Sequence, residues 1–272
     1  MVDRDGDRAG LPTDLRRETG PFDVIGDVHG CRLELEALLG ALGYAISRDD
    51  ADRPIGARHP SGRTVVLLGD LADRGPDTPG VFRLVMGMAA AGSGFSVLGN
   101  HDDKLLRALS GKKVRVTESL ERALAQLHRE PAEFHRAVVA FIGGMRAHHL
   151  LDGGRLVVAH AGLPESLHGA ESKPARRFCL RGGAGDVDEL GAPITPKWVV
   201  QYRGAAAVLF GHTPVTAPRW VNNTMCLDTG CVFGGSLTAL RYPERELVAV
   251  RAARVYQEPR RPLRSSPGDA ET

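Results

Sequence analysis

Five short, mainly apolar runs in this chain each end in a turn that contains a glycine and a polar side chain. The runs cover residues 22–25, 64–68, 94–98, 156–159 and 207–210. Apolar runs of this length closed by a turn are typical of buried strands. Leucines at helical spacing follow the first run, at Leu35, Leu38 and Leu42. The alternation predicts an α/β fold, in which functional side chains gather at the carboxyl ends of the strands.

The length of 272 residues and the absence of a linker or repeat predict a single domain over residues 21–256. Residues 1–20 are polar and predict a mobile tail, and the Pro/Arg/Ser-rich residues 257–272 predict a disordered one. The net charge of +2 excludes a strong whole-molecule attraction to nucleic acid or membrane. No run is long enough to span a membrane and no signal sequence begins the chain, so we expect a cytoplasmic protein.

Four further segments complete the expected organisation. Residues 112–142 predict two helices, and the Gly/Pro-rich residues 164–197 predict a long functional loop. The charged residues 47–63 predict a solvated connector. Two β-patterned runs at 236–242 and 246–251, with no helix between them, predict a second sheet packed on the first. The four cysteines form no Cys-x-x-Cys pair, so we expect reduced, partly buried thiols.

The turns after the five runs supply a set of oxygen and imidazole donors. They are Asp27, His29, Asp70, Asn100, His160 and His212. Mixed oxygen and nitrogen donors suit Mn, Fe, Zn, Co or Ni. One ion could not use all six and still admit a substrate, so we expect two ions that share a carboxylate. Asp70 follows a central strand and is our candidate for the shared ligand. Two ions about 3.5–4 Å apart can hold a bridging hydroxide and clamp an in-line phosphoryl displacement.

Other polar residues of these turns fit the same chemistry. Arg74 offers a guanidinium suited to the oxygens of a phosphate. His101 could protonate the leaving oxygen, with Asp73 orienting it. Asp228 could hold a ligand histidine through its other ring nitrogen. Taken alone, each is an ordinary turn residue, and the prediction depends on the ordered set.

Two groups of basic residues allow a further phosphate contact. Lys112, Lys113 and Arg115 form a small cluster, for which a solvated loop is the default interpretation and a phosphate-backbone contact the alternative. In the predicted loop, we expect Arg177 or Arg181 to act as a second phosphate clamp.

The ordered motifs resemble those of the calcineurin-like metallophosphoesterases. They are Gly26-Asp-x-His-Gly30, Gly69-Asp-x-x-Asp-Arg-Gly75, Gly99-Asn-His-Asp102, Val-Ala-His160-Ala-Gly and Gly211-His-Thr213. The Asp-Arg-Gly block resembles the branch that contains the Ser/Thr protein phosphatases and the diadenosine tetraphosphatases. The resemblance implies a four-layer αββα sandwich of two mixed β-sheets with a dinuclear site that is usually supported by manganese.

The resemblance also implies roles for individual residues. It assigns Arg74 to the phosphate and Asp73–His101 to an acid pair. It gives one metal to Asp27 and His29, the other to Asn100, His160 and His212, and both to Asp70.

Further segments resemble the phosphatase module of bacterial polynucleotide kinase-phosphatase. They are Arg83–Met88, His101–Arg107, Phe178–Leu180, Tyr202–Gly204, Asn222–Gly235 and Leu237–Pro243. That resemblance implies removal of 3′-phosphates and 2′,3′-cyclic phosphates from RNA ends. This chain has no Gly-x-x-x-x-Gly-Lys-Ser/Thr motif, so a separately encoded kinase or ligase would be its partner in end repair.

The first functional hypothesis is therefore a manganese-dependent phosphoesterase that acts on nucleotides or on RNA or DNA 3′ ends by metal-bridged hydroxide attack. The alternatives are a protein Ser/Thr phosphatase and a diadenosine tetraphosphatase. A remote alternative is a non-catalytic binding module, which the complete set of ligands disfavours. One metal site serves many phosphoesters, so the sequence leaves the substrate, the native metal and the oligomeric state open.

Overall fold

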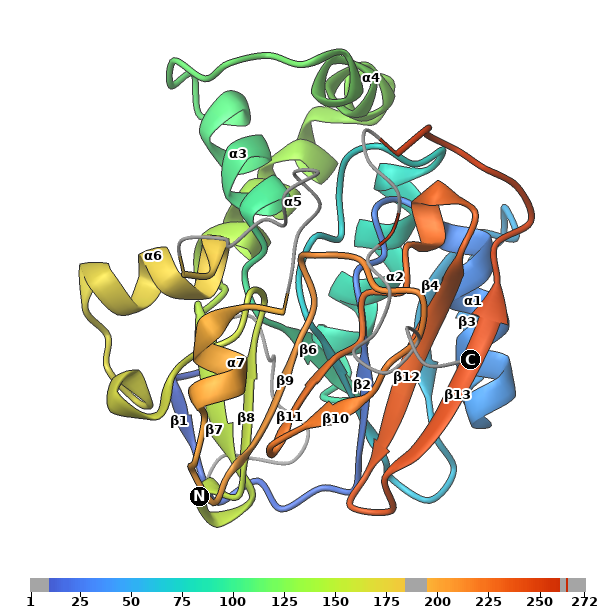
Figure 1. Cartoon of the computed structure of the whole chain (residues 1–272). Helices are drawn as coiled ribbons and strands as arrows, with labels where there is room; N and C mark the ends of the chain where they lie inside the picture. Colours follow the sequence, from blue (N-terminus) through green and yellow to red (C-terminus); the bar gives the residue numbers. More distant parts are fainter. Residues whose placement is uncertain (1–9, 184–194, 260–262, 264–272) are drawn as a thin grey trace.

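The computed structural model describes residues 10–183, 195–259 and 263 of the chain. Two sheets lie face to face in the middle of the molecule, and helices cover their outer sides (Figure 1). Residues 1–9, 260–262 and 264–272, which belong to the two expected tails, and residues 184–194 of the expected long loop lie outside the described residues. Within the described part of the chain, no helix has the length and apolar character needed to cross a membrane.

One sheet has five strands in the order β13-β12-β2-β5-β6. Three of them are mutually parallel, and β12 runs antiparallel to β2 and β13. Their bounds are β2 (Phe22–Ile25), β5 (Thr64–Leu67), β6 (Gly94–Ser96), β12 (Ser236–Tyr242) and β13 (Glu246–Arg251). The last two runs therefore extend the first sheet. The expected second sheet is present, but these two runs do not belong to it. Four backbone pairs between β12 and β2 join them.

The other sheet has six strands in the order β1-β7-β8-β9-β11-β10 and is also mixed. Its strands are β1 (Asp14–Leu15), β7 (His148–Leu151), β8 (Leu156–Ala159), β9 (Ala207–Phe210), β10 (Trp220–Val221) and β11 (Thr224–Cys226). Strand β1 falls inside the expected N-terminal tail. It pairs with β7, and Leu15 is buried between the sheets, so this part of the tail is folded.

Seven α-helices are described. Those over the five-stranded sheet are α1 (Arg32–Leu42) and α2 (Thr78–Ala90). Those over the six-stranded sheet are α6 (Lys173–Arg181) and α7 (Lys197–Gln201). The flanking group is α3 (Asn100–Leu109), α4 (Glu118–Leu127) and α5 (Ala132–Gly144). Short 3-10 turns are η1 (Asp152–Gly154), η2 (Glu165–Leu167) and η3 (Cys231–Phe233).

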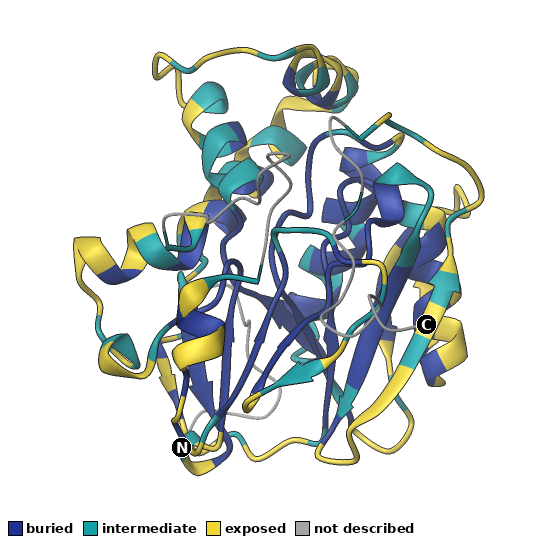
Figure 2. Cartoon of the chain, in the orientation of Figure 1, coloured by how far each residue is buried: buried dark blue, intermediate teal, exposed yellow. Residues whose placement is uncertain are grey.

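Alternating side chains along the strands build three apolar layers. Ile25 points to α1 and α2, whereas its neighbour Val24 points between the sheets. On the opposite sheet, Val158 points between the sheets and Val157 points to Trp198 of α7. Figure 2 shows the strands as the most buried part of the chain, with exposure on the outer helix faces and on β13. Three cores between four layers confirm the predicted αββα sandwich.

Two further elements were not predicted, because their sequences are mainly polar. The expected connector 47–63 contains most of a hairpin of β3 (Ala45–Arg48) and β4 (Pro54–Arg58), which packs on α2. Gly87 of α2 permits this contact, because a Cβ there would lie 1.6 Å from the carbonyl oxygen of Ile55. The expected loop 164–197 contains α6, which begins after the N-cap Ser172 and buries only a narrow apolar face. The four cysteines are free and buried.

Candidate functional site

The strand registers bring the polar turns to one edge of the molecule. Ile25 pairs with Leu67, and Leu67 pairs with Ser96, so the turns after β2, β5 and β6 lie side by side. In the facing sheet Val158 pairs with Leu209, so the turns after β8 and β9 also lie side by side. Parallel strands end together, so all six predicted donors reach one region.

Asp70 lies between two buried histidines. Its Oδ2 atom is 3.5 Å from Nε2 of His29 and 3.5 Å from Nε2 of His160. Its Oδ1 atom accepts the backbone N–H of His101 at 2.8 Å, which orients the carboxylate. Ligands that share an ion at about 2.0–2.2 Å lie roughly 3–3.5 Å apart, so this carboxylate can serve an ion on each side. The geometry supports Asp70 as a shared ligand.

The backbone fixes the direction of both histidine rings. Nδ1 of His29 lies 3.0 Å from the Ala72 carbonyl oxygen, and Nδ1 of His160 lies 3.0 Å from that of Leu68. A ring that donates from Nδ1 to a carbonyl turns the lone pair of Nε2 into the site. Burial lowers the pKa of both histidines, so the rings are held in the neutral form that binds metals.

Asn100 and His212 complete the donors around His160. Nε2 of His160 lies 2.8 Å from Oδ1 of Asn100 and 3.1 Å from Nδ1 of His212. Burial, and then the nearby His160, lower the pKa of His212 to about 3. Asp70, His160 and His212 can offer ligand atoms within 4.8 Å of one another, and Asp70 can do the same with His29 and His101. Two donor groups therefore share one carboxylate, and the residues present fit a pair of divalent ions.

Asp27 lies against the second group through the backbone. Its carboxylate accepts the N–H of His212 at 3.1 and 3.3 Å. Gly211 makes this approach possible, because a Cβ there would lie 1.9 Å from Oδ1 of Asp27. Burial, and then the charges of Asp228 and Asp70, raise the pKa of Asp27. Three neighbouring buried carboxylates repel one another, and bound cations would relieve that repulsion.

Asp228 does not make the contact that the sequence predicts. Among the described residues, its carboxylate accepts the N–H of Gly230 at 3.0 Å, and no hydrogen bond joins it to a histidine. Burial raises its pKa to about 6. Asp228 acts on Asp27 through its negative charge. The hydrogen bond that its carboxylate accepts comes from within the short turn Asp228–Gly230.

Asp73, Arg74 and His101 form a connected group beside His29. Oδ2 of Asp73 is 2.6 Å from Nδ1 of His101. The Arg74 guanidinium lies 2.9 Å from Nε2 of His101 and 2.8 Å from Nε2 of His29. Nε2 of a neutral His29 has one lone pair, so an ion bound there would displace Arg74 toward the open side of the site. The structure thus brings together the three residues expected to handle the phosphate and the proton.

Backbone strain is concentrated at this edge. Nine described residues other than glycine have a positive φ, and they include His29, Asp70, Asp73, Arg74 and His212. Side chains rarely adopt this conformation, and proteins retain it mainly where function requires a fixed geometry. The turns therefore hold these five side chains in orientations that relaxed loops would not.

Asp102 belongs to the motif Gly99-Asn-His-Asp102, but no role was predicted for it. Its buried carboxylate accepts N–H groups from Leu71 at 3.0 Å, Ala72 at 3.1 Å and Gly99 at 3.2 Å. These bonds tie the start of α3 to the turn that carries Asp70. An Asp three residues after a glycine N-cap is the signal that could have identified it.

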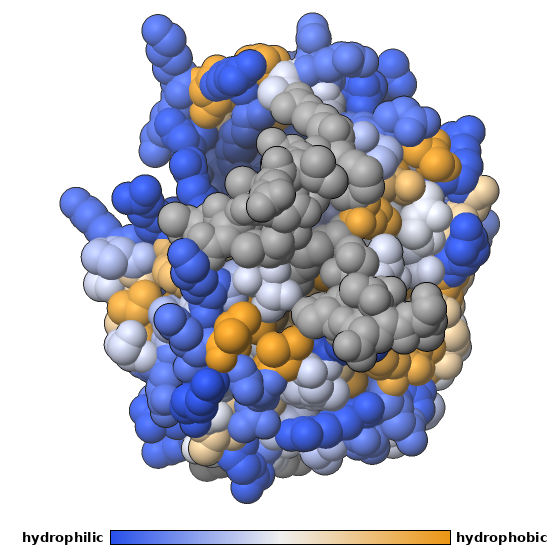
Figure 3. Space-filling model, in the orientation of Figure 1, coloured by the Kyte–Doolittle hydropathy of each residue, from blue (hydrophilic) through white to orange (hydrophobic). Residues whose placement is uncertain are grey.

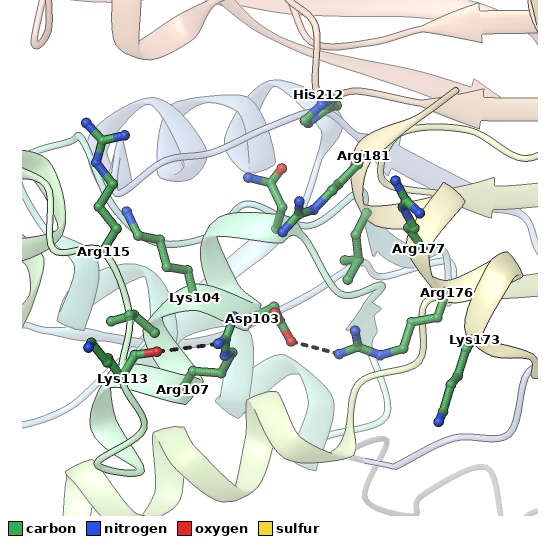
Figure 4. Close-up of a pocket in the computed structure, with 13 residues that line it drawn as sticks. Asp103, Lys104, Arg107, Lys113, Arg115, Lys173, Arg176, Arg177, Arg181 and His212 are labelled. Atoms are coloured by element: carbon green, nitrogen blue, oxygen red, sulfur yellow. Dashed lines mark hydrogen bonds and ion pairs between the residues drawn. The ribbon is translucent and has the colours of Figure 1, made fainter. Parts of the chain in front are cut away.

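A cavity of about 920 Å³ opens from the second donor group (Figure 4). Asn100 and His212 form its inner end, and α3 and α6 form two of its walls. The structure places Arg177 and Arg181 on α6 in this cavity, which agrees with the expected substrate contacts. Arg176 is held at 2.8 Å by Asp103 of α3.

The chain is similar to one family of phosphoesterases and to several individual proteins. The family model described as Calcineurin-like phosphoesterase matches residues 20–216. A relative named asymmetrical bis(5′-nucleosyl)-tetraphosphatase PrpE from Anoxybacillus flavithermus is 40% identical over 240 residues, which cover 86% of this chain and 96% of that protein. The protein of that name from Bacillus subtilis is 40% identical and covers 89% of this chain and 99% of itself.

Solved structures show the same fold. A crystal structure described as a candidate diadenosine tetraphosphatase has a TM-score of 0.63 and 27% identity, covering 89% of this chain and 98% of its own. The structure of a Ser/Thr protein phosphatase from Saccharomyces cerevisiae has a TM-score of 0.56 at 13% identity. The match covers 92% of this chain and 85% of that one. The matched model spans most of the described sandwich and contains all six donors, so the chain belongs to the calcineurin-like phosphoesterase family.

Proposed function

We propose that this protein is a metal-dependent hydrolase that cleaves dinucleoside tetraphosphates asymmetrically. The observation that carries the proposal is the similarity to several PrpE tetraphosphatases at about 40% identity over nearly the whole length of both chains. Asymmetric cleavage of a bridge of four phosphates gives a nucleoside triphosphate and a nucleoside monophosphate. The polynucleotide-end hypothesis rests on motif resemblance alone and becomes an outcome of the test.

The donor geometry supports this chemistry. In the proposal, Asp27 and His29 hold one divalent ion, Asn100, His160 and His212 hold another, and Asp70 contacts both. Bound there, such ions would polarise the phosphate and make a hydroxide nucleophile available at neutral pH. Manganese is the ion we propose, because imidazole and carboxylate donors without cysteine favour a borderline or hard cation.

The remaining groups act on the substrate directly. Arg74 can turn its guanidinium onto two oxygens of the phosphate under attack, a bidentate contact that also offsets developing negative charge. Once Arg74 has turned from Nε2 of His101 onto the phosphate, that nitrogen can carry the proton for the leaving oxygen, while Asp73 holds Nδ1 at 2.6 Å and stabilises the charged ring. Burial acts to raise the pKa of Asp73, but the hydrogen bond and charge of His101, together with hydrogen bonds from Ser119 and the backbone N–H of Arg74, outweigh burial and lower that pKa to about 2. Asp73 is therefore a carboxylate at neutral pH.

A substrate panel with the purified, manganese-loaded protein tests the proposal. It contains diadenosine tetraphosphate, a 3′-phosphate oligonucleotide, a 2′,3′-cyclic nucleotide and a phosphopeptide. We expect kcat/KM to be at least tenfold higher for diadenosine tetraphosphate than for the others, with ATP and AMP as products. Preferential turnover of the oligonucleotide or the phosphopeptide, or release of two ADP molecules, would contradict the proposal.

A further inference from the structure

The cavity beside the donor site has a strongly cationic lining. Eight lysine and arginine side chains line it, against one carboxylate, Asp103. They are Lys104, Arg107, Lys113, Arg115, Lys173, Arg176, Arg177 and Arg181. The cations of α3 and the following segment lie on one side in Figure 4, and those of α6 lie on the other. In Figure 3 the surface over α3 is mainly hydrophilic, beside a hollow.

Most of this charge is not neutralised within the described part of the chain. Arg176 pairs with Asp103, but the other seven cations have no carboxylate partner among the described residues. Lys104 donates to Oγ1 of Thr117 at 3.1 Å, and Arg107 donates to the carbonyl oxygen of Lys113 at 3.5 Å. Both partners are neutral acceptors, so they position the side chains and leave their charge available to a ligand.

The net charge of the whole chain is only +2, so this concentration of positive charge is local. Like charges gathered around a hollow repel one another and favour binding of an anion. A phosphate bound at the two donor groups would already contact Arg74 and the ions proposed there. The cations along α3 and α6 therefore match additional negative charge that continues from the reacting phosphate into the cavity.

We propose that this cavity binds the further phosphates of a polyphosphate chain, beyond the phosphate that is attacked. The inference rests on the proposed function and deepens it. Arg177 and Arg181 contact the phosphates next to the donor site, and Lys113 and Arg115 contact those farther along. These residues make the enzyme prefer substrates with several consecutive phosphates.

The lining distinguishes a polyphosphate from a nucleic-acid strand. Proteins that bind single strands combine cations with aromatic rings on which bases stack. No Phe, Tyr or Trp side chain is among the described residues that line this cavity, and its apolar members are Val114 and Leu180. A chain of phosphates needs no stacking surface, so the lining matches a polyphosphate better.

Neutralising the far pair of cations tests the proposal. The variant K113Q/R115Q is compared with R136Q/R251Q, a matched control that removes two exposed cations outside the cavity. Each protein is assayed with p-nitrophenyl phosphate and with diadenosine tri-, tetra- and pentaphosphate in the presence of manganese.

For K113Q/R115Q, we expect kcat/KM to fall at least tenfold more for the tetraphosphate than for the aryl phosphate, mainly through KM. The loss should grow from the tri- to the pentaphosphate and should shrink at high salt, because screening weakens the contacts of the native protein. The control should keep the native order of preference. An equal loss on all four substrates, or no loss, would overturn the proposal.

A binding measurement separates this inference from the proposed function. Calorimetric titration of the manganese-loaded protein with inorganic tripolyphosphate should show binding at least tenfold tighter than with orthophosphate, and K113Q/R115Q should lose that difference. If dinucleoside tetraphosphates are not cleaved but the difference is present, the proposed function fails and the polyphosphate site stands. If the native protein binds both anions equally, the polyphosphate site fails whatever the enzyme cleaves.

Discussion

Replacement of Asp102 by asparagine should destabilise the protein and loosen the donor site. The buried carboxylate accepts three backbone N–H groups, from Leu71, Ala72 and Gly99. Asparagine can keep an oxygen toward the first two, but its amide NH₂ must then face the N–H of Gly99. One hydrogen bond to a charged acceptor is lost and a buried donor is left unpaired, and the two effects together cost about 2–4 kcal/mol of unfolding free energy.

Urea unfolding followed by circular dichroism measures this loss. For a chain of this size, a slope of about 3 kcal/mol per molar urea converts the expected change into a midpoint lowered by about 1 M. The matched control is Asp103→Asn, at the next position of α3. Asp103 pairs with Arg176 at the surface, so its replacement should cost less than about 1 kcal/mol.

The same variant should weaken metal binding, because Asp102 holds the backbone of Ala72, whose carbonyl oxygen orients His29. Burial and the charge of Asp70 raise the pKa of Asp102 to about 8, although the three N–H donors act to lower it. The unfolding and metal-binding measurements are therefore made at pH 9, where the folded carboxyl group is charged. If Asp102→Asn left the urea midpoint and the manganese affinity unchanged, Asp102 would be neutral in the folded protein and the reasoning would be refuted.

Three further predictions concern the site and the pH dependence. Asp70→Asn should remove the carboxylate that both donor groups share. Elemental analysis should then find one manganese ion or none per chain in place of two, and kcat should fall more than about 1,000-fold. Retention of two ions would contradict the shared position of Asp70. Asp73→Asn removes the charged acceptor that lies 2.6 Å from Nδ1 of His101, and a hydrogen bond to a charged group is worth about 1.5–3 kcal/mol. The variant should therefore lose about ten- to hundredfold in rate on an alkyl phosphate and markedly less on an aryl phosphate, and equal losses would argue against proton donation by His101. Burial lowers the pKa of His149 to about 4, below its unfolded value of 6.5. Between these two values the unfolded state binds a proton that the folded state does not, so the free energy of unfolding falls as the pH falls. The loss begins near pH 6.5 and reaches about 2 kcal/mol at pH 5. Urea midpoints of His149→Gln should fall less steeply over this range than those of the native protein, and parallel slopes would contradict the linkage.

Much of the architecture was predictable because strand signals are local. The runs at Phe22–Ile25, Leu156–Ala159 and Ala207–Phe210 end in the structure where the sequence predicts, since an apolar run closed by a polar turn defines a buried strand by itself. The hairpin β3–β4 and helix α6 were missed because their outer faces are charged. Only packing against α2 and the six-stranded sheet selects those conformations.

The partners of individual side chains were less predictable. Asp228 accepts a hydrogen bond from Gly230 and not from a histidine, and Asp102 accepts N–H groups from Leu71 and Ala72, which lie some 30 positions away in the chain. Such contacts depend on distances between segments that are far apart in the chain. Periodicity describes each segment separately and carries no information on those distances.

The amino-acid sequence by itself determined which donors this protein has and that they follow strands, because strand periodicity and turn chemistry act over a few residues. Tertiary structure alone decided that Asp70 lies 3.5 Å from both His29 and His160, and that the cations of α3 and α6 face one cavity. The physical reason is that strand register and helix packing set these positions. Both arise from burial of apolar surface summed over the whole chain.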